Sequence, residues 1–217
     1  MKADLHIHTN FSNDGVSTIE EVAEFAVKTG LGCISVTDHN KFEAYDLLKD
    51  RKEFIIIPGE EVSSAEGHIL AYGIQSEIER GMSIIKTIES IHDAGGIAVA
   101  AHPYRWWSGL GEKNVIPEFD GVEAFNSRSR KKDNRRSFNL ATILNKPITG
   151  GSDAHAPEFI GKGYTVFQDN IVTWEDAVKA IMNKETDVDG GSRGFGETLK
   201  YTWKSITQWA GRGFRKM

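Results

Sequence analysis

Short apolar runs alternate along this chain with amphipathic segments of helical periodicity, and this alternation restricts the fold more than any other feature. The runs are apolar throughout rather than at every second position, which is typical of strands covered on both faces. After a first strand that starts at Ala3, the expected strands lie at 34–36, 54–57, 68–74, 97–101, 121–125, 147–151 and 164–167.

Amphipathic helices are expected at 18–30, 42–48, 83–94, a segment that ends at 144, and 174–183. Strands that alternate with helices of ~10–15 residues predict βα units around a parallel sheet. The chain has 217 residues and no sequence repeat of fixed period. Because β/α barrels of roughly 200–250 residues commonly form one domain, a barrel of this kind fits the length.

Charge and composition exclude several classes of protein. The net charge of −5 provides no general basic field for nucleic acid, and no apolar run approaches the ~20 residues of a membrane span. The chain enters its first expected strand at once, without the features of a signal peptide. The single cysteine, Cys33, rules out a disulfide within the chain. A cytoplasmic location is therefore expected.

The first strand carries two histidines that point the same way. Residues two apart on a strand share a face, so His6 and His8 converge, and Asp14 follows in an Asn-Asp-Gly turn. Two interpretations are open at this point: a metal site, or two ordinary half-buried strand histidines.

Other histidines and acids favour the metal site because they follow expected strands. His39, His102 and His155 do so, together with Glu61 and Asp153; His68 begins a strand after a tight turn. In a β/α barrel the C-terminal ends of the strands form one rim, so these side chains should meet there. Only His92, inside a helix, does not fit, and we interpret it as a surface or packing residue.

Seven motifs resemble those of PHP (polymerase and histidinol phosphatase) domains over about residues 3–167. They are His6-Ile7-His8, Asp14-Gly15, Thr37-Asp38-His39-Asn40, Pro58-Gly59-Glu60-Glu61, Gly67-His68, Ala101-His102-Pro103 and Gly151-Ser152-Asp153-Ala154-His155. The resemblance implies a distorted seven-stranded β/α barrel with a trinuclear metal centre.

By the same resemblance, the chain holds nine ligands for three divalent ions. His6, His8, Asp153 and a bridging Glu61 would bind the first ion. Glu61, His68 and His102 would bind the second, and Asp14, His39 and His155 the third.

Three acidic residues next to the expected ligands are not expected to bind metal themselves. Glu60 is expected beside the centre, in an outer layer or the pocket. Asp4 and Asp38 either orient imidazoles or make simple hydrogen bonds at the rim.

The expected chemistry is hydrolysis of a phosphoester. Nitrogen and oxygen ligands without thiolate suit Zn, Mn or Fe. Paired metals acidify a bridging water and clamp the oxygens of an in-line displacement. Glu61, Asp153 and His155 are the expected catalytic residues. The preferred substrate is a small phosphomonoester, with a nucleotide among the candidates; the alternatives are a 3′–5′ exonuclease and a catalytically silent metal-binding module.

Cationic and aromatic residues near the expected rim are candidates for substrate contacts. Arg105 and Arg128 can each grip a phosphate with two N–H groups. Lys162 is a weaker candidate, and Trp106 with Trp107 either stack on a nucleobase or pack on their own loop. The run 128–136, with six bases and one acid, is either a solvated helix start or a funnel for anionic substrates.

The last part of the chain is set apart by its charge. We expect a barrel domain at 1–189 and a basic, aromatic, helical tail at 190–217, with six Lys or Arg against one Glu from Gly191 onward. The tail either covers the barrel or docks a partner, a membrane surface or nucleic acid.

Overall fold

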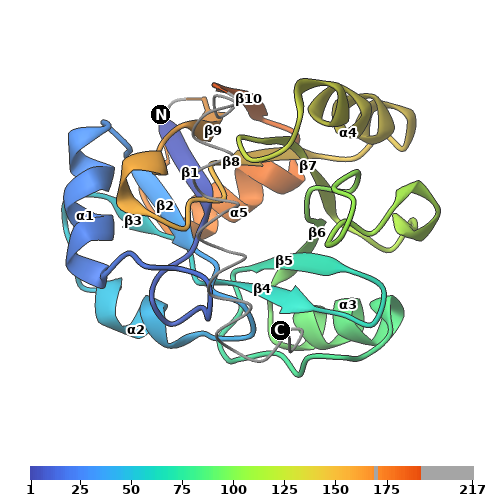
Figure 1. Ribbon diagram of the computed structural model, residues 1–217, viewed down its shortest axis with the longest axis horizontal. Helices are drawn as coiled ribbons and strands as arrows, with labels where there is room; N and C mark the ends of the chain where they lie inside the picture. The colour runs from blue at the N-terminus through green and yellow to red at the C-terminus, as the bar shows by residue number, and fades with distance from the viewer. Residues whose placement is uncertain (169–170, 192–217) are drawn as a thin grey trace.

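The computed structural model describes residues 1–168 and 171–191, which fold into two five-stranded sheets with helices packed against them (Figure 1). The first sheet has the order β10-β9-β1-β2-β3 and contains β1 (Lys2–Ile7), β2 (Cys33–Val36), β3 (Ile55–Ile56), β9 (Gly163–Phe167) and β10 (Thr186–Gly190). The second has the order β4-β5-β6-β7-β8 and contains β4 (Gly59–Ser63), β5 (His68–Tyr72), β6 (Ile97–Ala100), β7 (Gly121–Asn126) and β8 (Ile148–Gly151).

The helices of the described residues lie close to their expected positions. They are α1 (Ile19–Lys28), α2 (Glu43–Leu48), α3 (Ile84–Asp93), α4 (Lys131–Ile143) and α5 (Trp174–Met182), with short 3₁₀ turns η1 (Glu112–Asn114) and η2 (Pro157–Phe159). At the start of α1, Thr18 and Glu21 form a reciprocal capping box, which satisfies backbone N–H groups that have no partner within the helix.

The mixed α/β class is confirmed, but the expected closed seven-stranded barrel is not what the strands form. The pairs β4–β5, β5–β6, β1–β9 and β9–β10 are antiparallel, and no continuous ladder joins the two sheets of the described residues. The physical reason is the connections: β4 returns directly into β5 through residues 64–67, and such a short turn can join only antiparallel strands.

The two sheets nevertheless meet at one end, through two isolated bridges, Ile7 with Ala154 and His39 with Glu61. The approach is tight: a side chain at Gly151 would place its Cβ 2.4 Å from the Cβ of His6. Only glycine allows β8 to come so near β1. This meeting point brings the ends of strands from both sheets together.

Three buried apolar clusters support this arrangement. One packs α1 and α2 on the first sheet, and a second packs α3 and α4 on the second sheet. The third includes Leu5, Leu70 and Phe167 and joins both sheets to α5. Polar side chains, rather than apolar ones, fill the meeting point of the sheets.

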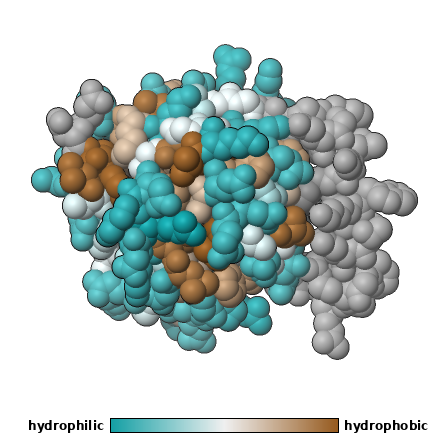
Figure 2. Space-filling model, turned by 90° about the vertical axis from the view of Figure 1, so that its left-hand side faces the viewer, coloured by the Kyte–Doolittle hydropathy of each residue, from teal (hydrophilic) through white to brown (hydrophobic). Residues whose placement is uncertain are grey.

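The face that carries α1 and α2 is largely hydrophilic, with separate apolar patches (Figure 2). Within the described residues, no helix combines the length and the apolar character that crossing a membrane would require. The expected tail at 190–217 lies almost wholly outside the described residues; Gly190 ends β10, a strand the sequence did not predict.

Candidate metal centre

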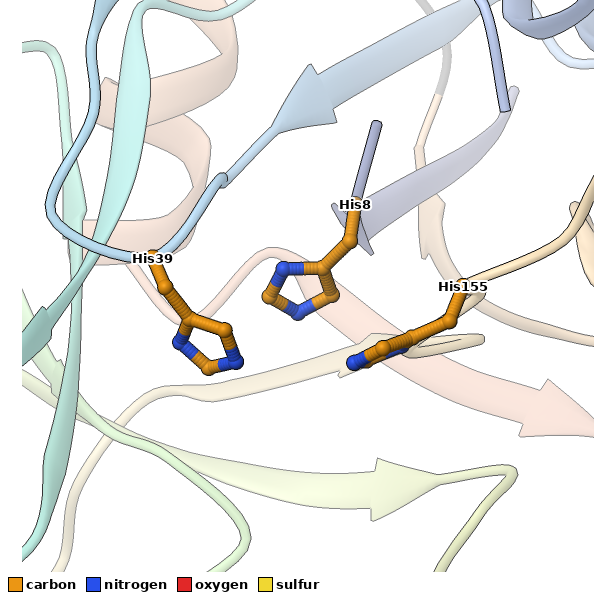
Figure 3. A group of neighbouring side chains, drawn as sticks. All are labelled: His8, His39 and His155. Carbon is orange, nitrogen blue, oxygen red and sulfur yellow. The ribbon is translucent and has the colours of Figure 1, made fainter. Parts of the chain in front are cut away.

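All nine residues predicted as metal ligands gather where the two sheets meet. They come from the end of β1 (His6 and His8), the β1–α1 loop (Asp14), the loop after β2 (His39), β4 (Glu61), the start of β5 (His68), and the segments after β6 (His102) and β8 (Asp153 and His155). Figure 3 shows His8, His39 and His155, from three separate segments, turning their rings toward one another.

Glu61 lies at the middle of the cluster. Its Oε1 is 2.9 Å from His68 Nδ1 and 2.9 Å from His102 Nε2. Its other oxygen, Oε2, is within 3.2 Å of a ring nitrogen of three further histidines, which are His6, His8 and His39. Burial opposes the charge on Glu61, but the surrounding imidazoles outweigh it and hold its pKa well below the usual range.

Asp153 and Asp14 border the cluster on its other side. Asp153 Oδ1 lies 3.3 Å from His155 Nδ1 and 3.6 Å from His8 Nε2. Asp14 Oδ2 lies 2.9 Å from His155 Nε2, and its Oδ1 is 3.8 Å from His39 Nε2. Asp153 adopts a φ of 50° and His102 a φ of 27°, conformations that non-glycine residues rarely adopt and that often occur at functional sites.

The donor atoms fit divalent metal ions. Four overlapping sets of ligand atoms each lie within 4.8 Å of one another: His8, His39 and His155; His6, His8 and Glu61; His6, His102 and Asp153; His39, Glu61 and His68. Buried Asp14 Oδ1, His39 Nδ1 and His102 Nδ1 make no hydrogen bond among the described residues. Imidazole nitrogens only 3.1 Å apart, as in His6 and His8, also suit a shared cation.

The surroundings shift the pKa of the buried histidines in opposite directions. Burial lowers the pKa of His102 and of His155 to about 4, which keeps both rings neutral and able to bind metal near pH 7. For His6, burial is outweighed by Glu123, Asp153 and Glu61, which raise its pKa well above the ordinary value. Of His6, His102 and His155, only His6 has neighbouring carboxylates whose effect on the pKa exceeds that of burial.

Glu123, on β7, is an outer residue that the sequence analysis did not single out. Its Oε1 is 2.8 Å from His6 Nδ1, and its Oε2 accepts the backbone N–H of His102 at 2.7 Å. A carboxylate in this position fixes the orientation of a metal-binding imidazole. The available signal was one acidic residue inside the otherwise apolar strand 121–125.

Asp4 and Asp38 hold backbone rather than imidazoles. Asp4 accepts backbone N–H groups of His6, Ser152 and Gly161. Asp38 accepts the hydroxyl of Ser12 at 2.6 Å, and that hydroxyl oxygen lies 3.1 Å from His8 Nδ1. Asp38 also accepts the backbone N–H of Thr9, the residue after His8, at 2.7 Å.

Arg105 and Arg128 both contact residues of the centre. Arg105 donates to Asn126 Oδ1 at 2.7 Å and also bonds Asp153 Oδ2. Arg128 Nη1 lies 2.9 Å from Asp153 Oδ1 and from His155 Nε2. The two guanidinium groups hold the pKa of Asp153 well below its usual range despite burial.

Lys162, a weaker candidate for substrate contact, and His92, interpreted as a surface or packing residue, make other contacts. Lys162 Nζ is 4.9 Å from the centre of the Phe159 ring. His92 Nε2 is 2.7 Å from Asp120 Oδ2, away from the centre, on the exposed side of α3.

Glu60 does not contact the imidazole cluster, because neighbouring residues on β4 face opposite ways. It is fully buried; Oε2 accepts the backbone N–H of Ile78 at 3.0 Å, and Oε1 has no partner among the described residues. Burial raises its pKa from 4.5 to about 8. Glu60 is therefore a protonated, buried acid near neutral pH.

Glu60→Gln should remove a pH dependence of stability. In the unfolded chain Glu60 loses its proton near pH 4.5 but in the folded chain only near pH 8, so wild-type stability falls as pH rises between these values. Relative to wild type, Glu60→Gln should gain on the order of a few kcal/mol between pH 5 and 8. Denaturant unfolding at several pH values measures this, with exposed Glu89→Gln as control. A difference independent of pH would contradict it.

A buried group of imidazoles and carboxylates at strand ends defines a candidate metal-binding centre of an α/β protein. The PHP-associated family model matches residues 131–186. The uncharacterised protein MJ1587 of Methanocaldococcus jannaschii is 35% identical over 144 residues, which is 60% of this chain and 84% of that protein. The chain belongs to the PHP-domain family.

Solved structures of other proteins share the fold. A two-domain protein from Bacteroides vulgatus, containing a predicted PHP-like metal-dependent phosphoesterase, aligns with a TM-score of 0.74 at 18% identity over 94% of this chain and 69% of that one. The lesion-specific endonuclease PfuEndoQ from Pyrococcus furiosus aligns with a TM-score of 0.68 at 20% identity over 86% of this chain and 57% of that one.

Proposed function

We propose that this chain is a metal-dependent phosphoric ester hydrolase that releases phosphate from a small phosphomonoester. The observation that carries the proposal is Glu61, one buried carboxylate with ring nitrogens of five histidines within 3.2 Å. A purely structural hydrogen bond needs one such partner, whereas a carboxylate shared by several cations needs many donor atoms around it.

Three divalent ions, of Zn, Mn or Fe, would be held by the nine clustered ligands. His6, His8, Asp153 and Glu61 would hold the first; Glu61, His68 and His102 the second; Asp14, His39 and His155 the third. Such ions polarise a phosphoryl group and make water a nucleophile near neutral pH. The carboxylates of Glu61, Asp153 and Asp14 would offset their charge.

The chain's own cations would orient the substrate. Arg105 and Arg128 extend from two loops to the same carboxylate, Asp153. Their N–H groups can bind the oxygens of a phosphate, which carry the charge in the transition state. We expect Asp153 and His155 to position the reacting group against these arginines, with Glu123 and Ser12 fixing the imidazoles of His6 and His8.

The test is turnover by the full chain after reconstitution with Zn, Mn or Fe. A panel of phosphomonoesters, including ribose 5-phosphate and nucleoside monophosphates, should release phosphate. Cleavage of oligonucleotides alone would favour the nuclease alternative, which the fold shared with PfuEndoQ also suggests. Bound metal without turnover on any phosphoester would favour the silent metal-binding module.

Arg128→Ala should weaken phosphate binding. Loss of a charge-assisted hydrogen bond is worth ~1.5–3 kcal/mol, so kcat/KM for ribose 5-phosphate should fall roughly 10- to 100-fold. Arg51→Ala, which removes an arginine of the α2–β3 segment paired with Glu53, is the matched control and should change the rate by less than about twofold. Equal rates for Arg128→Ala and wild type would exclude Arg128 from substrate binding.

A further inference from the structure

Trp106 and Trp107 are the two most exposed large apolar side chains among the described residues, at 86% and 81%. Their rings contact each other, with centroids 4.8 Å apart and planes 33° apart. The proposed hydrolysis does not use them. Adjacent tryptophans in water leave a large apolar surface uncovered, which marks a site of interaction more often than chance.

Backbone hydrogen bonds hold the loop that carries the two rings in a defined conformation. Gly109 N donates to Arg105 O at 3.0 Å, and Gly111 N donates to Pro103 O at 2.8 Å. A Cβ at Gly109 would lie 2.6 Å from both of those carbonyl oxygens, so this conformation of the loop requires glycine at position 109. Ser108 O accepts the backbone N–H of His68 and ties the loop to β5. The two rings are thus presented on a fixed base.

The same loop connects the rings to the metal centre. It begins at His102, and Arg105, which directly precedes Trp106, bonds Asp153 and Asn126. The tryptophan pair therefore directly follows, in the chain, a residue that contacts the centre. This adjacency distinguishes the pair from the other exposed apolar residues of the surface.

Helix α4 brings a positive charge to the loop that carries the rings. The Arg136 guanidinium lies 3.8 Å from the centre of the Tyr104 ring, two residues before Trp106. Lys131, Lys132 and Arg135 of the same helix are also exposed. In a chain of net charge −5, this local excess of cations complements an anionic ligand with an aromatic part.

We propose that Trp106 and Trp107 form a stacking platform for a nucleobase, so that the phosphoester at the metal centre belongs to a nucleotide. This inference rests on the proposed function and names its substrate class. Tryptophan faces bind any base by stacking. A mononucleotide and the end of a single strand share this chemistry.

The first experiment compares two phosphomonoesters that differ by the base. On the metal-loaded full chain, the ratio of kcat/KM for adenosine 5′-monophosphate to that for ribose 5-phosphate should fall about tenfold in Trp106→Ala/Trp107→Ala, since stacking of one base contributes that much. Ile143→Ala, which removes an exposed apolar side chain of α4, should leave the ratio unchanged. An unchanged ratio in the double tryptophan variant would overturn the platform.

The second experiment separates failure of the platform from failure of the proposed function. Nucleotide should quench the fluorescence of the wild-type chain more than that of Trp106→Ala/Trp107→Ala, whether or not any ester is hydrolysed. Quenching with no turnover would leave the platform and reject the hydrolase. Equal quenching of both proteins, or a response to anionic lipid vesicles and not to nucleotide, would overturn the platform.

A 5′-phosphorylated oligoadenylate then distinguishes the two sources of the base. Loss of the tryptophans should raise its Kd by more than that of adenosine 5′-monophosphate if a strand is the ligand, and by a similar factor if a single nucleotide is. No rise for either would count against the platform.

Discussion

Glu61→Gln is expected to reduce bound metal sharply and to lower kcat/KM on the order of a thousandfold, because the metal ions of such sites supply several kcal/mol of charge stabilisation. Glu61 is the carboxylate shared by the largest number of imidazoles in the centre. An amide keeps the size of the side chain but loses the negative charge that balances adjacent cations. The effect should therefore appear in metal content as well as in rate.

The control for this variant is Glu60→Gln, the neighbouring residue on the same strand. Glu60 is equally buried but bonds Ile78 instead of the histidines, so its amide variant should retain its metal and turnover. Elemental analysis and rates on ribose 5-phosphate, measured side by side, compare the two. Full metal content in Glu61→Gln, or equal losses in both variants, would show that Glu61 does not organise the centre.

Asp14→Ala is expected to remove one metal ion and most turnover while leaving the fold intact. Asp14 lies in the loop between β1 and α1, outside every strand and helix, so its loss disturbs no ladder. It is paired with His155 at 2.9 Å, and its Oδ1 has no hydrogen-bond partner among the described residues. Loss of this ligand should lower kcat roughly a hundredfold, which corresponds to about 2.7 kcal/mol of transition-state stabilisation.

Metal stoichiometry, circular dichroism and kcat together test this prediction. Exposed Asp50→Ala is the matched control and should behave as wild type. Unchanged turnover in Asp14→Ala would remove Asp14 from the site. A loss of the circular dichroism signal would instead assign Asp14 a role in folding.

Much of the fold was predictable because apolar runs and helical periodicity are local signals. The limits of α2, α3 and α5 differ from expectation by only a few residues. The direction of the strands is not a local signal. No strand was expected between 57 and 68, yet Gly59–Ser63 forms β4 and pairs antiparallel with β5. Strand β10 is polar and mostly exposed, so its sequence contains no apolar run that would predict a strand.

The centre was predictable to the extent that its residues follow strands. His6 and His8 converge as their spacing requires, although β1 ends at Ile7 and His8 is held by Ala154 O beyond it. Glu60 was misplaced because its direction depends on the unexpected strand β4. Glu123 was missed because its contact with His6 joins residues 117 positions apart, and no local pattern indicates such a contact.

Equilibrium dialysis of the full chain against Zn, Mn or Fe, followed by elemental analysis, tests the central claim most directly. The proposal predicts about three ions bound per wild-type chain, the same number in His92→Ala, and fewer in Glu61→Gln. Less than one bound ion per wild-type chain under excess of every metal would contradict it.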